Sequence, residues 1–244
     1  MIKKIKNKFI NYIIQRKAIK QPLSIKGRVE LKKNDLRLIE SNLTPRVLVN
    51  EKAYSMSHPI DFNLIPNSVL NEILLNWDHI EMALGSEGVL RSCSVYRNIH
   101  VPKKERKKEI FSDAWHRDTI GVTNVQMFIL LHNTVLDNGP FRYVNSDDMQ
   151  QVIKMYPELE NPQNRSLKNE INENYVSYFL GLRGDFLLVN TFTNFHSATI
   201  PKIGFKRDMV SIAFEPKKLT KWKNNLGKKQ IQGMLQNSNV QSKK

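Results

Sequence analysis

The chain of 244 residues contains a single cysteine, Cys93. One cysteine cannot form a disulfide within the chain, and the sequence has neither a CxxC pair nor a cysteine and histidine cluster typical of structural zinc. We therefore expect a reducing compartment and a cytoplasmic protein. A chain of this length buries a substantial core without disulfides or structural metals, so one compact domain is the simplest expectation.

The sequence also lacks a long uninterrupted apolar run. Its first twenty residues place Ile2, Ile5, Phe9 and Ile13 at roughly helical spacing, but lysines interrupt them throughout. Such a segment suits neither a spanning helix nor a signal peptide. Two roles stay open for it. One is a helix packed on the domain with a solvated basic face, which we favour, and the other is peripheral contact with an anionic surface at the inner face of a membrane.

Acidic residues are scarce at both ends, which is where the net charge of +15 arises. Residues 1–33 carry +10 and residues 216–244 carry +8, which leaves −3 for residues 34–215. Because a nucleic-acid-binding enzyme would more often carry basic residues across its working face, we expect no nucleic-acid partner. These shifts in composition divide the chain into a basic amphipathic segment 1–33, a single domain 34–215 with helical buttresses, and a basic, flexible tail 216–244.

No glycine-rich phosphate loop occurs, and this absence bears on the tripeptide His116-Arg117-Asp118. The same three residues occur in the catalytic loop of protein kinases. That loop requires an asparagine five residues after the aspartate, whereas position 123 is Thr123. A kinase is therefore excluded, and the tripeptide needs another explanation.

The patterns between the two ends predict helices first and strands afterwards. Apolar residues recur at intervals of three and four over 66–84, which predicts an amphipathic helix, and a second, short helix is expected after Ser146. Short apolar or β-branched runs between turn residues predict strands at 89–96, 123–131, 141–145, 185–190 and 208–214. This order favours a mostly β fold with flanking helices, arranged as a barrel or a sandwich.

The strongest chemical signal combines residues that are far apart in the sequence. On an extended strand successive side chains alternate, so His116 and Asp118 point the same way and Arg117 points the other way. His196 follows His116 by eighty residues, and Arg207 lies eleven residues further. Two imidazoles and one carboxylate suit Fe(II) and leave open positions for oxygen activation. Arg207 would offer a forked pair of donors to an acidic cosubstrate, and 2-oxoglutarate has the required shape.

An HxD tripeptide alone occurs often by chance, so the interpretation depends on the whole set of motifs. The set comprises Trp115-His116-Arg117-Asp118, the turn and strand at 137–144, the run 184–190, and His196-Ser197-Ala198 with Arg207. With these motifs, residues 88–215 resemble the phytanoyl-CoA dioxygenase-like branch of the Fe(II)/2-oxoglutarate-dependent oxygenases. The resemblance implies a double-stranded β-helix, which is a jelly-roll, cupin-like core. It also implies iron held by His116, Asp118 and His196, and 2-oxoglutarate anchored by Arg207.

Five further residues are candidates for the cosubstrate pocket. The resemblance implies that the strand before the HxD motif, 92–98, contributes a side chain, and Tyr96, Arg97 and Asn98 are the candidates there. Asn124 and Gln126 lie two residues apart on an expected strand, so both can face the same cavity. A structural role is an equally good interpretation of each of the five.

The resemblance implies a dioxygenase that uses Fe(II), 2-oxoglutarate and O2. The expected reaction hydroxylates a C–H bond of a small-molecule, lipid-linked or glycan-linked substrate and releases succinate and CO2. Asp118 favours hydroxylation over halogenation, because halogenating relatives replace this carboxylate with a small residue. The segment 144–148 departs from the family's Pro-Gly-Ser-His type of turn, so the substrate side of the site stays open. Two other functions also stay open: a non-catalytic binding or scaffold module on the same fold, and a cupin-like metal enzyme that does not use 2-oxoglutarate.

Overall fold

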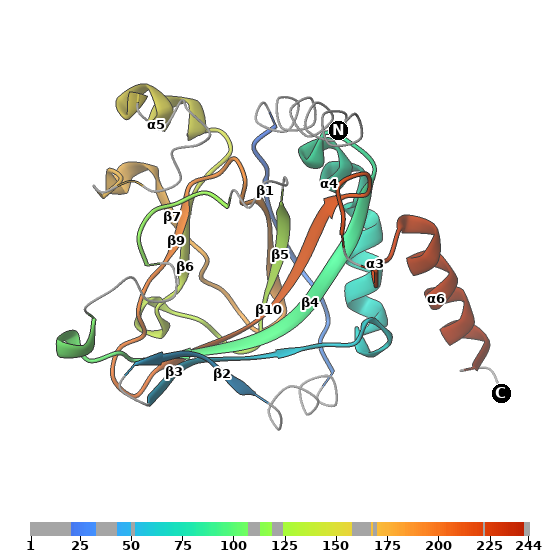
Figure 1. The fold of residues 1–244 in the computed structure, drawn as a ribbon, viewed down its shortest axis with the longest axis horizontal. Helices are drawn as coiled ribbons and strands as arrows, with labels where there is room; N and C mark the ends of the chain where they lie inside the picture. The colour runs from blue at the N-terminus through green and yellow to red at the C-terminus, as the bar shows by residue number, and fades with distance from the viewer. Residues whose placement is uncertain are drawn as a thin grey trace, which may run out of the picture.

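The computed structural model describes residues 21–32, 43–49, 52–106, 113–118, 124–157, 167, 170–221 and 223–241. Two antiparallel sheets face each other across the middle of the molecule (Figure 1). The larger sheet has the strand order β1 (Ser24–Arg28), β8 (Asp185–Asn190), β5 (Val125–Leu130), β10 (Lys206–Pro216), β4 (Gly88–Ile99), β3 (Lys52–Pro59) and β2 (Thr44–Val49). The smaller sheet has the order β7 (Val176–Tyr178), β6 (Phe141–Val144) and β9 (His196–Ala198). This arrangement confirms the predicted double-stranded β-helix core.

Alternation along the strands gives the larger sheet two different faces. Along β10, Val210, Ile212 and Phe214 point to the outer face and join the core beneath the helices. Arg207 and Ser211 point to the inner face, toward the smaller sheet. The strands predicted at 89–96, 123–131, 141–145, 185–190 and 208–214 correspond to β4, β5, β6, β8 and β10, because apolar and β-branched runs pack well on a pleated surface.

Helices cover the outer face of the larger sheet. The predicted helix 66–84 is two helices, α3 (Asn67–Leu75) and α4 (Trp77–Leu84), separated at Asn76. The Asn76 side chain donates to the Glu72 carbonyl oxygen at 2.9 Å, and such local side-chain bonding competes with helix continuation. Helix α4 ends at Gly85 with φ 68°, a left-handed conformation that favours glycine.

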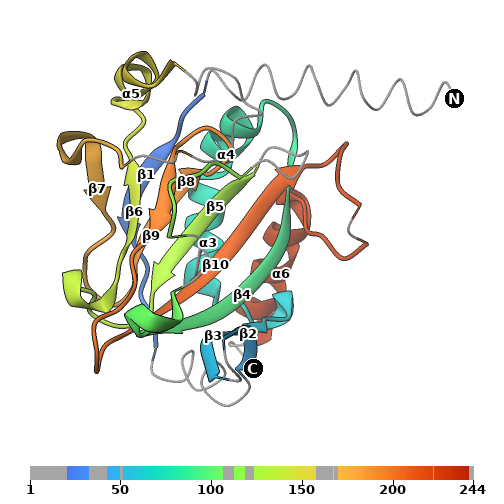
Figure 2. The same cartoon turned by 60° about the vertical axis from the view of Figure 1, so that its left-hand side comes forward.

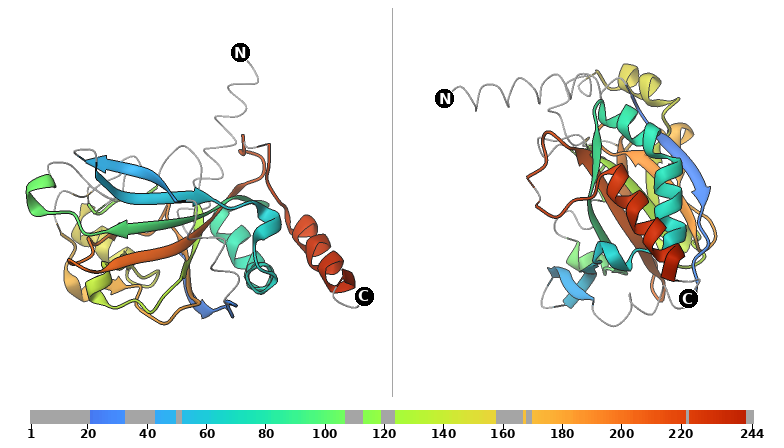
Figure 3. Two further views of the ribbon diagram at one scale, coloured as in Figure 1. Left: turned by 90° about the horizontal axis from the view of Figure 1, so that it is seen from below. Right: turned by 90° about the vertical axis from the view of Figure 1, so that its right-hand side faces the viewer.

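A further helix, α6 (Lys228–Gln241), lies beside α3 (Figures 2 and 3). It falls in the expected flexible tail 216–244, so that expectation does not hold for these residues. Ile231 of α6 is fully buried in the same core as α3, and Leu226 exchanges backbone hydrogen bonds with Leu90 at 2.8 and 3.0 Å. The helix was not predicted because the segment is rich in lysine and only a few of its positions are apolar and pack in the core.

The boundary expected between a separate segment 1–33 and the domain does not hold either. Strand β1 lies inside the predicted separate segment 1–33, yet it pairs with β8 at the edge of the larger sheet. Residues 1–20, which carry the proposed membrane contact, lie outside the described residues. Within the part of the chain that is described, no helix is both long enough and apolar enough to cross a membrane.

Two further elements extend the sheets. The hairpin of β2 and β3, which the sequence patterns did not predict, extends the larger sheet beside β4. Helix α5 (Met149–Met155) is the short helix expected after Ser146 and follows β6 at the end of the smaller sheet. Between the sheets, aromatic side chains such as Phe128, Phe141 and Phe179 fill one part of the interior, and the remainder is a cavity.

Candidate metal centre

His116, Asp118 and His196 meet at the wall of this cavity. The backbone brings them together, because the His116 amide donates to the His196 carbonyl at 2.9 Å and the His196 amide donates back at 3.0 Å. The Asp118 amide donates to the Thr191 carbonyl at 2.7 Å. Candidate ligand atoms of the three side chains all lie within 4.8 Å of one another. Arg117 points away from them, with its guanidinium 4.6 Å from the centre of the Phe195 ring.

Hydrogen bonds orient both imidazole rings. His116 Nδ1 lies 2.8 Å from the Ala114 carbonyl oxygen, and His196 Nδ1 lies 3.0 Å from the Asn194 carbonyl oxygen. A carbonyl can only accept, so each Nδ1 carries a proton and each Nε2 faces Asp118 Oδ1, at 3.9 Å for His116 and 3.8 Å for His196. Burial lowers the pKa of His196 to about 4 against the opposing effect of Asp118, which favours the neutral form that binds metals.

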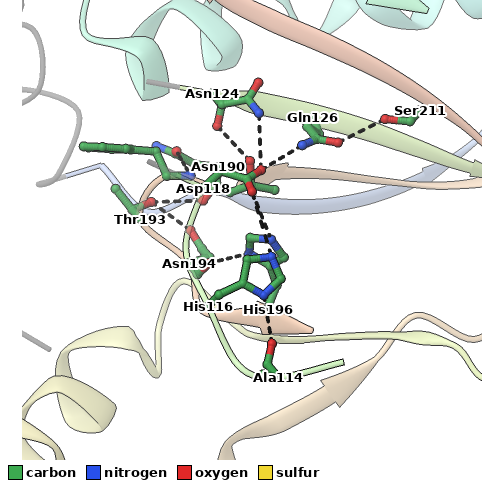
Figure 4. Close-up of polar contacts among 12 residues, drawn as sticks. Ala114, His116, Asp118, Asn124, Gln126, Asn190, Thr193, Asn194, His196 and Ser211 are labelled. Atoms are coloured by element: carbon green, nitrogen blue, oxygen red, sulfur yellow. Dashed lines mark hydrogen bonds and ion pairs between the residues drawn. The ribbon is translucent and has the colours of Figure 1, made fainter. Parts of the chain in front are cut away.

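Two amides hold the other oxygen of Asp118 (Figure 4). Gln126 Nε2 donates to Asp118 Oδ2 at 2.9 Å and Asn124 Nδ2 donates to it at 3.3 Å. Ser211 Oγ in turn donates to Gln126 Oε1 at 3.0 Å. Hydrogen bonds from residues that do not themselves bind a metal fix the direction of a ligating carboxylate. Here they leave Asp118 Oδ1 directed toward the histidines. Asn124 and Gln126 therefore lie beside the predicted ligands, and Gln126 also lines the cavity.

The turn before His196 is built from buried amide side chains. Asn190 Nδ2 donates to the Ala83 carbonyl at 3.1 Å and ties the turn to helix α4. Asn194 Nδ2 donates to the Val144 carbonyl at 3.1 Å and ties it to β6. These residues were not predicted, although two asparagines and two threonines that alternate with phenylalanines before a histidine were a signal that the turn is buried and bonded through its side chains.

Arg142 connects the two segments that carry the histidines, and the sequence reasoning assigned it no role. Its guanidinium stacks over the Trp115 ring at 4.6 Å, and its Nε donates to Ser197 Oγ at 2.5 Å. Glu170 accepts from Trp115 Nε1 at 2.8 Å and lies 2.9 Å from Arg142 Nη1. Arg142 thus holds the residue before His116 and the residue after His196 in fixed positions.

The cavity has a volume of about 510 Å³. Its lining comprises Arg46, Ser55, Arg91, Ser92, Ser94, Tyr96, Asn98, His116, Asp118, Gln126, Phe128, Phe141, His196, Ser197, Ala198, Arg207, Ser211 and Ala213. Hydroxyls, amides and guanidiniums dominate this list, and Phe128 and Phe141 form an apolar part of the wall with ring centres 4.7 Å apart. A polar cavity with a few convergent groups is typical of a small-molecule site.

Arg207 faces this cavity and is only 2% exposed. Its Nη1 donates to the carbonyl oxygens of Gly139 and Thr199, the latter at 3.0 Å. With the amide of Asn98 oriented to accept from Arg207 Nη2 at 2.5 Å, that amide also donates to Ser55 Oγ at 2.7 Å. Arg207 Nε is buried without a hydrogen-bond partner among the described residues. Burial lowers the pKa of Arg207, and a buried cation of this kind suits an anionic ligand.

The candidates on β4 separate into two groups. Tyr96 and Asn98 line the cavity with Arg207, and burial raises the pKa of Tyr96. Arg97 lies between them on the opposite face of the strand, where its Nε and Nη2 each donate to Asp208 at 2.7 Å. Arg97 is therefore not available to a ligand in the cavity, because β4 is regular at this point and neighbouring residues of a regular strand point to opposite faces.

The residues present fit an Fe(II) site. Two imidazole nitrogens and a carboxylate oxygen form the donor set, and Cys93 lies in the core on the outer face of the sheet. In the described part of the chain, no other group of three histidine, cysteine or acidic side chains comes close enough to hold an ion. Hard and intermediate donors without a thiolate favour a non-haem iron site over structural zinc or an iron–sulfur cluster.

No protein-family model and no curated protein matches the chain. Among solved structures, the chain is similar to the non-haem α-ketoglutarate-dependent epimerase SnoN from nogalamycin biosynthesis, with 12% identity, a TM-score of 0.50, and coverage of 85% of this chain and 84% of that one. HygX from Streptomyces hygroscopicus, solved with nickel and 2-oxoglutarate bound, gives 14% identity, a TM-score of 0.49, and coverage of 86% and 89%. At such identities the likeness to SnoN supports the fold, and the function has to be argued from the site itself.

Proposed function

We propose that this protein is an Fe(II)/2-oxoglutarate-dependent dioxygenase of the phytanoyl-CoA dioxygenase-like type. In this proposal it hydroxylates a C–H bond of a small-molecule, lipid-linked or glycan-linked substrate. The observation that carries the proposal is the meeting of His116, Asp118 and His196 at the wall of a polar cavity that also holds the buried Arg207. Metal ligands alone are compatible with many reactions, whereas the added buried guanidinium points to an acidic cosubstrate.

Each residue of the centre has a distinct task in this proposal. His116 Nε2, His196 Nε2 and Asp118 Oδ1 would hold the iron, since hydrogen bonds already occupy both Nδ1 atoms and Asp118 Oδ2. When bound, iron and 2-oxoglutarate supply the oxidising chemistry, with O2 as oxidant and succinate and CO2 as products. The chain supplies the position of the ligands and limits the access of water. Phe141 contributes to both, because its ring stacks on His196 with 5.4 Å between the ring centres.

Arg207 would bind the distal carboxylate of 2-oxoglutarate. Arg207 and Ser211 lie on the same face of β10 and are four residues apart, which is about 13 Å along a strand. Ser211 contacts Gln126, and Gln126 holds Asp118. A five-carbon dicarboxylate together with the length of the arginine side chain suits this separation. Asn98 would keep the guanidinium in place, because its amide accepts from Arg207 Nη2.

The proposal is tested by measuring succinate formed from 2-oxoglutarate by the purified protein, with and without added Fe(II). We expect iron-dependent succinate formation that Asp118→Ala abolishes. Asp78→Ala is the matched control, because this carboxylate pairs with Lys228 on the surface and does not belong to the ligand cluster. Full turnover by Asp118→Ala would contradict the assignment. Iron binding by the wild type without any consumption of 2-oxoglutarate would favour a cupin-like metal enzyme or a non-catalytic module instead.

A further inference from the structure

A β-bulge turns a second arginine, Arg91, into the cavity. The register of β4 against β10 changes so that Ala213 lies opposite Ser92 and Phe214 lies opposite Leu90, which makes Arg91 the extra residue of β4. Leu90 packs in the core on the outer face, whereas Arg91 and Ser92 both line the cavity. In a regular strand Arg91 and Ser92 would point to opposite faces, so the bulge is the feature that aims Arg91 inward.

Arg91 is incompletely bonded. Its Nη1 lies 3.9 Å from Glu215 Oε2, which is beyond hydrogen-bonding distance. Its Nε is buried without a hydrogen-bond partner among the described residues. Glu215 Oε1 is also buried without a hydrogen-bond partner among them. Arg97, on the same strand, donates instead to both oxygens of Asp208 at 2.7 Å. Because an unsatisfied buried donor is costly, the site around Arg91 favours an additional acceptor.

Arg91 and Arg207 lie at different ends of the cavity. Arg207 is opposite Asn98 on β4, whereas Arg91 is next to Ser92, which is level with Ala213 on β10. Ala213 is in turn level with Gln126 on β5, the residue that holds Asp118. Arg91 therefore lies at the end of the cavity near the Asp118 anchor. A 2-oxoglutarate molecule that extends toward Arg207 would leave Arg91 to a different ligand.

The charges on the cavity wall also favour an anion near Arg91. If iron and 2-oxoglutarate are bound, the two positive charges of the ion and that of Arg207 balance Asp118 and the two carboxylates of the cosubstrate. Arg46 and Arg91 line the same cavity in addition, and Glu215 offsets one of them. Ser92 and Ser94 add hydroxyl donors on the face of β4 next to Arg91.

We propose that the substrate of this site carries an anionic group, a carboxylate or a phosphate, which Arg91 binds. This inference rests on the proposed function and names the substrate class of the same site. The anion would make charge-assisted hydrogen bonds to the guanidinium, including its unsatisfied Nε. That contact would position a neighbouring C–H bond of the substrate toward the side of the cavity formed by His116, Asp118 and His196.

Matched pairs of small probes test this proposal. Phenylacetate is compared with phenylacetamide, and phenyl phosphate with phenol, by calorimetry on protein loaded with Fe(II) and 2-oxoglutarate without oxygen. We expect at least one anion to bind about tenfold or more tightly than its neutral partner. Arg91→Gln should reduce this preference to about twofold or less, because the charged donor is lost. The two pairs also show which anion, carboxylate or phosphate, the site prefers.

Two further variants separate ligand binding from other effects. Arg28→Gln removes the same charge from a side chain on the edge strand β1, which is paired with Asp185 at 3.7 Å, and it should leave the preference unchanged. Glu215→Gln removes the carboxylate that competes for Arg91, so it should strengthen anion binding. If the pair were only structural, Glu215→Gln would instead weaken or not alter anion binding. Thermal unfolding of each variant identifies loss of fold.

The proposal is overturned if the wild type binds the neutral probes as tightly as the anions, or if Arg91→Gln keeps the preference. The same samples report on the proposed function independently, through the visible absorption band of iron-bound 2-oxoglutarate. Absence of that band in the wild type would contradict the oxygenase assignment. Calorimetry on the metal-free protein would still decide whether Arg91 binds anions.

Discussion

The two faces of the larger sheet have opposite character, although the same strands form both. On the outer face, Cys93, Val95 and Ile212 pack beneath the helices in an apolar core. On the inner face, Ser94 and Ser211 line a polar cavity. The alternation of side chains along each strand produces this division. Stability therefore depends on the residues packed on one side of the larger sheet and ligand binding on those around the cavity on its other side, so substitutions should affect the two properties separately.

The largest expected effect is in the cavity that the inner face lines, at His196, which β9 of the smaller sheet contributes to the same cavity. His196→Ala removes one of three iron ligands, and we expect Fe(II) affinity to fall by about a hundredfold or more, since the loss exceeds that of an outer contact. The fold should persist, as judged by circular dichroism. His100→Ala is the control, because His100 bonds to the Pro201 carbonyl at 2.8 Å and does not belong to the cluster. Unchanged iron affinity in His196→Ala would mean that His196 is not a metal ligand, and that ligand binding does not depend on the cavity side of the sheet as we expect.

The reciprocal substitution is in the apolar core between the outer face and helix α3. Ile73 of α3 is fully buried in the core, so Ile73→Ala should lower the free energy of unfolding by about 2–5 kcal/mol. Urea unfolding measures this loss. Iron affinity, measured without denaturant, should stay close to the wild-type value. A large loss of iron affinity in folded Ile73→Ala would show that the two faces are coupled.

Charged residues on the outer face give a pH-dependent test. Burial alone would raise the pKa of Asp208, but hydrogen bonds from Arg97 and Lys206 outweigh it and hold the pKa below the usual 3.8. Because the folded pKa is lowered, this carboxylate stabilises the fold above the unfolded pKa, and the contribution is lost as the pH falls through the folded pKa. Asp208→Asn should therefore cost about 1.5–3 kcal/mol of unfolding free energy at pH 7 and less at pH 3. An equal loss of unfolding free energy at both pH values would show that the ion pairs of Asp208 with Arg97 and Lys206 do not stabilise the fold.

The smallest expected effect concerns Gln126, a residue of the inner face that orients a metal ligand without binding the metal. Gln126→Leu removes the 2.9 Å hydrogen bond to Asp118 Oδ2, and we expect Fe(II) affinity to fall by about tenfold to a hundredfold. The effect should be smaller than that of His196→Ala, because the ligand atoms themselves remain. Gln150→Leu, on an exposed position of α5, is the matched control. A loss as large as that of His196→Ala would mean that Gln126 has more than an orienting role.

Alternation and residue chemistry explain which features could be predicted from the sequence. Strands β4, β5, β6, β8 and β10 follow apolar runs that half-bury on a sheet. Strand β1 was missed because it is an edge strand with Lys26 and Arg28, and polar residues are common on edges. Helix α6 was missed because only a few of its positions contact the core.

The limits of prediction at the site are geometric. Tyr96, Arg97 and Asn98 were all candidates, but alternation allows only Tyr96 and Asn98 to face the cavity together. The bulge at Arg91 could not be predicted, because one extra residue in a strand leaves no pattern in that strand alone. The contacts of Asn124 and Gln126 with Asp118 require knowledge of how separate strands meet.

The central claim is that the three ligands and Arg207 form one site for iron and 2-oxoglutarate. The most direct measurement is titration of the Fe(II)-loaded protein with 2-oxoglutarate without oxygen, while recording the weak visible charge-transfer band of the chelate. We expect the wild type to give the band, and Arg207→Ala to require a much higher 2-oxoglutarate concentration for it. Absence of the band in folded, iron-loaded wild type, or an unchanged titration in Arg207→Ala, would contradict the account.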